Sequence, residues 1–210
     1  MPFTSRWKID IPDAHLASVL FTSPSHPLSK THRSFSEAAR PDTHYFTTHD
    51  FRLWCQRFAA GLRRSGLRPG DRVLLFSGND LFFPVVFMGV IMAGGVFTGA
   101  NPTFVARELA YQLQDSGATY LICADGSLET GVEAAQIVGL PRDRVFVFDN
   151  AIYDGRGAGR LGCRYWGELV ASVEEGDGFA WEELSTPELA DKNHALNYSS
   201  GTTGLPKAVE

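Results

Sequence analysis

The sequence predicts an α/β fold in which alternating β-α units build a largely parallel sheet covered by helices. Between residues 51 and 148, short apolar runs alternate with longer stretches whose apolar residues recur at helical spacing. Glycines separate successive units, where the chain must turn between a helix and a strand. The 44% hydrophobic and 20% charged residues are typical of a globular chain, and the formal charge of −5 favours neither nucleic acid nor acidic lipid as a partner.

The first predicted unit is a helix followed by a strand. Apolar side chains on one helical face place a helix that ends at Gly66; they are Phe51, Trp54, Cys55, Phe58, Ala59 and Leu62. Residues 73–76 follow as a short, fully buried strand.

The next segment, residues 81–100, contains no charge over twenty residues and is long enough to cross a bilayer. Pro84 lies near its start, and the Gly94-Gly95 pair divides it into a helix over 81–93 and a strand over 96–98. A buried helix of an α/β domain is apolar all round because both of its faces avoid water. We therefore favour a buried helix, with a membrane span as the alternative.

The alternation continues to residue 148. Ala106, Leu109, Ala110 and Leu113 mark an amphipathic helix closed by Ser116-Gly117, and the units after it are a strand over 119–123, a helix over 129–138 and a strand over 145–148. Residues 150–164 are expected as a surface loop, and residues 176–189 as an acidic, mobile connection. No internal repeat and no clean linker divides the chain, so it is one domain or part of one.

The cysteines and the N-terminal residues indicate where in the cell the protein is expected. Cys55, Cys123 and Cys163 are odd in number and widely spaced, which favours buried, reduced thiols over disulfides or a zinc site. The first residues lack an apolar stretch followed by a small-residue cleavage site. We expect an intracellular protein, cytoplasmic or peroxisomal.

Residues 198–209 predict a phosphate-binding loop. Gly201 and Gly204 let backbone N–H groups approach an anion closely, and Lys207 adds a mobile charge suited to a polyphosphate. Hydroxyls that can donate to phosphate oxygens stand at Ser199, Ser200, Thr202 and Thr203. A flexible linker is the alternative, but residues 195–198 are strand-like and Pro206 stiffens the exit. A Walker A loop is excluded, because Pro206 and Ala208 replace the glycine and the Ser or Thr that flank its lysine.

The run Tyr198-Ser-Ser-Gly-Thr-Thr-Gly-Leu-Pro-Lys207 resembles the signature of the adenylate-forming (AMP-binding) superfamily, and is most similar to that of coumarate-CoA ligase-like acyl- and aryl-CoA synthetases. Six further segments match in the order of that superfamily; they are Ser5-Arg-Trp7, Arg40-Pro-Asp-Thr-His44, Gly66-Leu-Arg-Pro-Gly-Asp-Arg-Val73, Phe76-Ser-Gly-Asn79, Ala100-Asn-Pro-Thr103 and Glu108-Leu-Ala-Tyr-Gln-Leu113. Together they extend the resemblance over the whole chain.

The resemblance implies a fold and a chemistry. Residues 1–210 would be a partial N-terminal adenylation domain that ends just after the phosphate loop, with the C-terminal lid domain absent. The reaction would join a small-molecule carboxylate and ATP into an acyl-adenylate, releasing pyrophosphate, and then form a thioester with CoA, with Mg²⁺ at the phosphates. The phosphates would be held by Ser199, Ser200, Gly201, Thr202, Thr203, Gly204 and Lys207.

Other groups that such enzymes use match no segment of this sequence, among them a later Thr-Glu pair, an aspartate for the ribose and a lysine of the lid. No complete catalytic set is expected, and the chain alone is expected to be inactive. A catalytically dead nucleotide-binding relative, or one chain of a split enzyme with a complementing C-terminal chain, are the alternatives.

Two residues depart from the family pattern. Ala208 replaces a glycine and would cost about 1 kcal/mol if its φ had to be positive. Val105 replaces a helix-capping Ser or Thr at a cost of about 1 kcal/mol. Six histidines are scattered without metal-ligand spacing, which favours surface or local hydrogen-bonding roles.

Overall fold

The computed structural model describes residues 7, 14–22, 28–183, 192–199 and 206–209. In this part of the chain the central sheet has seven strands in the order β7-β6-β5-β3-β4-β8-β9. Their bounds are β3 (Arg72–Phe76), β4 (Val96–Ala100), β5 (Ala118–Ala124), β6 (Val145–Phe148), β7 (Arg164–Tyr165), β8 (Ala195–Ser199) and β9 (Lys207–Val209). Every neighbouring pair is parallel except β8 and β9, so the predicted α/β class is confirmed.

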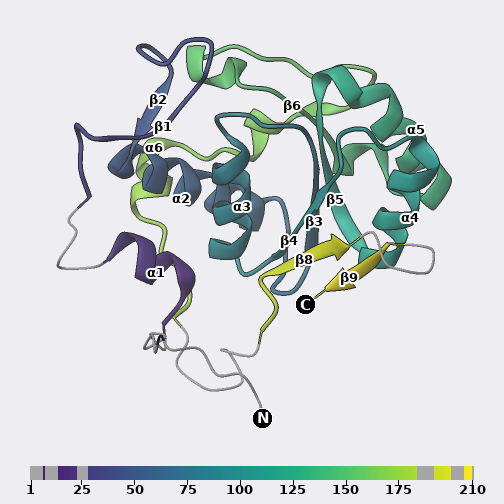
Figure 1. Ribbon diagram of the computed structural model, residues 1–210, viewed down its shortest axis with the longest axis horizontal. Helices are drawn as coiled ribbons and strands as arrows, with labels where there is room; N and C mark the ends of the chain where they lie inside the picture. Colours follow the sequence, from purple (N-terminus) through teal and green to yellow (C-terminus); the bar gives the residue numbers. More distant parts are fainter. Residues whose placement is uncertain (1–6, 8–13, 23–27, 184–191, 200–205, 210) are drawn as a thin grey trace.

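Helices cover both faces of this sheet, as Figure 1 shows. The helices α2 (Thr48–Arg64) and α3 (Phe83–Met92) lie on one side, and α4 (Ala106–Ser116) and α5 (Leu128–Val138) lie on the other. The central strands β3, β4, β5 and β6 are largely apolar and buried, as expected for a parallel sheet covered on both faces. The core therefore occupies two layers, one above and one below the sheet.

Short elements complete the described chain. An antiparallel pair, β1 (Arg33–Ser36) and β2 (Tyr45–Thr47), leads directly into α2. The remaining short helices are α1 (Leu16–Phe21), α6 (Val173–Asp177) and the 3-10 turns η1 (Asp125–Ser127), η2 (Arg142–Arg144), η3 (Ala151–Asp154) and η4 (Trp166–Leu169).

Local chemistry explains where the long helices start and stop. Thr47 caps α2, because its Oγ1 accepts from the N–H of Asp50 while Oδ2 of Asp50 accepts from the N–H of Thr47, both at 3.2 Å. Val105 stands at the N-cap of α4 and supplies no capping oxygen, as predicted, although its own N–H donates to Glu108 Oε2 at 3.0 Å. Gly117 ends α4 with a φ of 62°, a conformation that favours glycine.

The uncharged stretch folds as predicted from its glycines. Its helix, α3, has ten residues, and Gly94 turns the chain into β4 with a φ of 81°. None of the helices in the described ranges combines the length and the apolar character that a membrane crossing requires.

Two loop predictions need correction. The segment over 150–164 is not a plain loop, since it contains η3 and the first residue of β7. The segment over 176–189 begins inside α6, and its next residues pack on the protein: Phe179 and Trp181 contact the core, and Gln56 Nε2 donates to the Phe179 carbonyl at 2.9 Å. Apolar side chains every second residue hold this acidic segment against α2. Residues 184–189 lie outside the described part.

The three cysteines are buried and unpaired, as predicted. His44 is also buried, and its Nε2 lies 3.1 Å from Asp154 Oδ1, which is a local hydrogen-bonding role. At one edge of the sheet, β9 exposes all three of its residues.

Candidate functional site

The strands β8 and β9 flank the predicted phosphate loop. They form an antiparallel pair in which Ser199, the last residue of β8, lies opposite Lys207, the first residue of β9. Both residues are exposed. The pairing places a hydroxyl and an ammonium group of the predicted site side by side. The other predicted residues, Ser200, Gly201, Thr202, Thr203 and Gly204, lie outside the described residues.

The pair lies at the carboxyl edge of the parallel sheet. Because β8 runs parallel to β4, and β4 parallel to β3, the strands end together at Ser199, Ala100 and Phe76. Open α/β sheets bind ligands at the carboxyl ends of their strands. The fold therefore presents Ser199 and Lys207 where a ligand is expected.

Two further motif segments gather at the same edge. The segment over 76–79 begins at the end of β3 and the segment over 100–103 begins at the end of β4; β4 is the neighbour of β8 in the sheet, and β3 is the next strand after it. Asn101 Oδ1 accepts from the N–H and from the Oγ1 of Thr103, at 3.0 and 2.9 Å, which fixes the turn after β4. Motifs that are far apart in the sequence thus meet at one edge.

The helix α4 contacts both strands of the β8–β9 pair at the end where Ser199 lies opposite Lys207. The Tyr198 hydroxyl donates to Asp115 Oδ2 at 2.6 Å, and the Tyr111 hydroxyl donates to the Pro206 carbonyl at 3.1 Å. Burial, and next the hydrogen bond to Asp115, raises the pKa of Tyr198, so this hydroxyl keeps its proton and donates it. Sequence reasoning assigned no role to Tyr111 or Asp115. Two signals were present in the sequence: the two residues are four apart on a predicted helix, and Tyr111 lies within the family-like segment over 108–113.

The sequence raised the question whether Ala208 occupies a position that needs a positive φ. Among the described non-glycine residues only Leu161 has a positive φ, so Ala208 does not need the conformation that would strain an alanine. The described residues also contain no group of three or more His, Cys, Asp or Glu side chains able to hold a metal ion.

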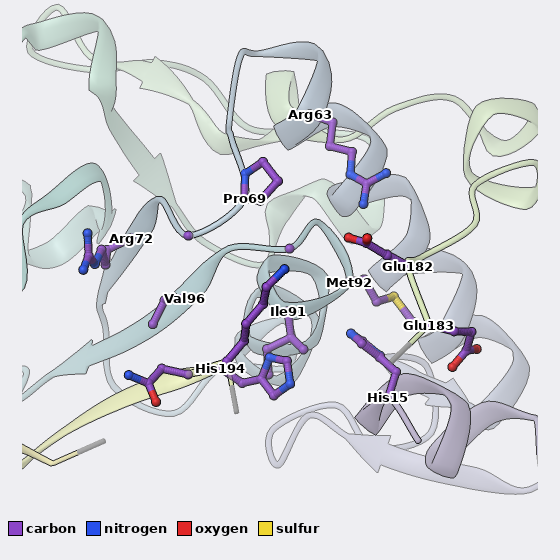
Figure 2. Close-up of a pocket in the computed structure, with 14 residues that line it drawn as sticks. His15, Arg63, Pro69, Arg72, Ile91, Met92, Val96, Glu182, Glu183 and His194 are labelled. Atoms are coloured by element: carbon purple, nitrogen blue, oxygen red, sulfur yellow. The ribbon is translucent and has the colours of Figure 1, made fainter. Parts of the chain in front are cut away.

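A cavity of about 300 Å³ lies at the opposite edge of the sheet (Figure 2). It opens at the amino ends of the strands, where Arg72 begins β3, Val96 begins β4 and His194 precedes β8. Figure 2 shows His15, the residue just before α1, and Arg63 from α2 facing it from other sides. Because the strands separate it from Ser199 and Lys207, this cavity is not part of the predicted phosphate site.

His15 lies at this cavity in surroundings that favour its neutral form. Its Nδ1 accepts from the N–H of Ala17 at 3.1 Å, which requires that nitrogen to be unprotonated, and its ring stacks on Trp181 and meets His194 edge-on. Burial, followed by the charge of His194, lowers the pKa of His15, although Glu183 opposes this. The stabilising contribution is complete above the unfolded pKa of about 6.5 and is lost as pH falls through the lower folded value.

We therefore expect the free energy of unfolding in urea to fall as pH decreases from 7.5 to 5.5. Asparagine keeps a capping acceptor but does not titrate, so His15→Asn should make this decrease smaller. An unchanged decrease in that variant would show that His15 does not contribute.

The chain is similar in sequence to known enzymes. The sequence model described as AMP-binding enzyme matches residues 26–210. The acyl-CoA ligase azaF of Aspergillus niger is 31% identical over the whole chain, which covers 38% of that protein. The 4-coumarate-CoA ligase 2 of Oryza sativa subsp. japonica is 34% identical over 78% of the chain, which covers 28% of its length.

A solved structure supports the fold. The anthranilate CoA ligase AuaEII, crystallised with anthranoyl-AMP, superposes with a TM-score of 0.68 at 19% identity, over 95% of this chain and 35% of that one. The chain thus spans well under half the length of the relatives it matches. Since the family match extends over most of its residues, the chain belongs to the AMP-binding enzyme family.

Proposed function

We propose that residues 1–210 are the N-terminal part of the adenylation domain of an ATP-dependent acyl- or aryl-CoA ligase, and that β8 and β9 carry its polyphosphate site. The observation that carries this proposal is the register of Ser199 against Lys207 at the carboxyl edge of the sheet. The family match and the relatives, which are an acyl-CoA ligase and a 4-coumarate-CoA ligase, support the same reaction class.

The proposed chemistry uses this edge to bind charge. Lys207 would neutralise the β- and γ-phosphates and the departing pyrophosphate, while the Ser199 hydroxyl donates to a phosphate oxygen. The residues from Ser200 to Gly204 would add backbone and hydroxyl donors. Mg²⁺, when bound, would spread the phosphate charge, and the substrate carboxylate would attack the α-phosphate before CoA takes the acyl group.

We further propose that this chain alone binds polyphosphate without turning over. The groups that would align the carboxylate in such ligases match no segment of the 210 residues. Positioning supplies much of the rate in phosphoryl transfer, so a site that holds only the phosphates should bind ATP and leave the α-phosphate unreacted. The three buried thiols suit an intracellular location, which belongs to the same proposal.

Binding by a lysine variant tests the site. We expect Lys207→Ala to raise the Kd for ATP or inorganic tripolyphosphate about tenfold or more, since a charge-assisted hydrogen bond is removed. Lys192 is an exposed lysine just before the other end of β8, so Lys192→Ala is the matched control and should leave the Kd unchanged. Equal effects of the two variants in isothermal titration calorimetry would contradict the proposal.

Turnover needs a separate measurement. We expect no pyrophosphate release from a panel of aromatic and fatty carboxylates with this chain, and adenylate formation would overturn the proposed inactivity. If activity appears when the C-terminal part of a related ligase is added in trans, the chain acts as one half of a split enzyme. If ATP binds and no addition restores turnover, the chain acts as a nucleotide-binding relative.

A further inference from the structure

The end of β8 that leads to the predicted loop is not held by the parallel sheet. Pairing of β8 with β4 involves only Ala195 and Leu196. The next three residues, Asn197, Tyr198 and Ser199, pair only with β9, which is itself an edge strand. Backbone pairing alone therefore only weakly determines where the side chains of Ser199 and Lys207 point.

Side chains of α4 form hydrogen bonds with both strands of the pair or the residue next to them. Tyr198 of β8 is bound by Asp115 through a short hydrogen bond of 2.6 Å, and the chain just before β9 is bound by Tyr111 through the Pro206 carbonyl at 3.1 Å. Tyr111 and Asp115 are four residues apart, so they share one face of α4. One helical turn thus contacts the chain next to Ser199 and the chain next to Lys207.

The helix itself is fixed to the sheet by a buried amide. Gln112, which is almost fully buried, donates to Thr98 Oγ1 at 3.0 Å and to the Gly99 carbonyl at 3.1 Å, both in β4. A buried polar side chain with two acceptors has little freedom to move. Asp115 and Tyr111 therefore project from a helix whose position on β4 is set.

We propose that Asp115 and Tyr111 are positioning residues that fix the spacing and direction of Ser199 and Lys207 for a polyphosphate. This inference rests on the proposed function of the β8–β9 pair. A preorganised site loses less conformational freedom when its ligand binds, so contacts that hold its two strands add affinity without touching the ligand. Asp115 acts through Tyr198, and Tyr111 acts through Pro206.

Because Asp115 is charged, loss of charge and loss of positioning change polyphosphate affinity in opposite directions. A carboxylate near a polyphosphate repels it, so an electrostatic effect alone predicts tighter binding after Asp115→Ala. Loss of positioning predicts weaker binding. Asp115→Asn keeps an oxygen acceptor for Tyr198 and removes the charge, so it separates the two effects.

The experiment measures the Kd of ATP and of tripolyphosphate by calorimetry. We expect Asp115→Ala and Tyr111→Phe each to raise the Kd about tenfold, and Asp115→Asn to raise it by less than about threefold. Asp143→Ala removes an exposed carboxylate from η2 and is the control, expected to leave the Kd unchanged. Unchanged or tighter binding by both Asp115→Ala and Tyr111→Phe would overturn the inference. If Asp115→Ala fails to fold, Tyr111→Phe, which removes one oxygen, decides the result.

Hydrogen exchange separates this inference from the proposed function. If the wild-type chain binds no polyphosphate, the proposed function fails, and amide exchange without ligand still tests α4. Faster exchange of peptides over 195–209 in both variants, with α3 and β5 unchanged, would support the holding role. Exchange equal to wild type in both variants would overturn it.

Discussion

Replacing Gly61 with alanine is expected to lower the free energy of unfolding by about 3 kcal/mol or more, a large fraction of the stability of an ordinary domain. In an exposed helix the same change would stabilise by up to about 1 kcal/mol. Here the added Cβ would lie 1.9 Å from the Leu169 carbonyl oxygen and 2.5 Å from its carbon. A backbone clash of this size reverses the sign expected from helix propensity.

The neighbouring segment cannot retreat without losing its own bonds to α2. The N–H of Ala171 donates to the Arg57 carbonyl at 3.0 Å, Arg57 Nε donates to the Ala171 carbonyl at 2.8 Å, and Leu169 is fully buried. The residues after η4 are therefore fastened to the helix that carries Gly61. Overpacking against fixed backbone is among the costliest single changes.

Chemical denaturation compares Gly61→Ala with a matched glycine. A Cβ added at Gly126 in η1 would meet no atom within 4 Å, and the φ of this glycine is not positive. Gly126→Ala should therefore change the free energy of unfolding by less than about 1 kcal/mol. Similar losses in the two variants would show that the contact with Leu169 is not the cause.

Local pattern was sufficient to predict the alternating part of this fold. The six apolar residues from Phe51 to Leu62 predicted α2, and the Gly94-Gly95 pair correctly divided an uncharged stretch into α3 and β4. These elements satisfy their backbone groups locally or in a parallel sheet, so period and turn residues describe them. The prediction of a mobile connection after α6 was wrong in part. Phe179 and Trp181 pack on the protein, and this segment contacts α2, which lies more than a hundred residues earlier in the sequence.

In the candidate site, too, local features could be predicted from the sequence and long-range contacts could not. The strand before the predicted loop and the charge of Lys207 were visible in the sequence, and β8 confirms the strand. The sheet order that brings β3, β4 and β8 together was not visible, because parallel pairing leaves no short-range mark on the chain. For the same reason neither the bond from Tyr198 to Asp115 nor the bond from Tyr111 to Pro206 could be predicted.

Thr98 connects the core to β8, and replacing it with valine is expected to lower the free energy of unfolding by about 2 kcal/mol. The Thr98 hydroxyl donates to the Leu196 carbonyl at 3.0 Å and accepts from Gln112 Nε2, and the residue is fully buried. Valine has the same shape and is more apolar. Its cost would therefore come from the Leu196 carbonyl and the Gln112 amide, each of which loses a partner where water cannot replace it.

Serine at the same position is the control for Thr98→Val. Thr98→Ser keeps the hydroxyl and removes one methyl group, at a cost of about 1 kcal/mol. If hydrophobic burial decided the outcome, Thr98→Val would be more stable than Thr98→Ser. The hydrogen bonds from Gln112 through Thr98 to Leu196 predict the opposite order, with Thr98→Ser the more stable variant. Urea unfolding of the two variants gives this order directly. Leu196 is the last residue of β8 that pairs with β4. A larger decrease in the free energy of unfolding for Thr98→Val would therefore show that the buried hydrogen bonds of Thr98 help to hold β8, the strand that carries Ser199.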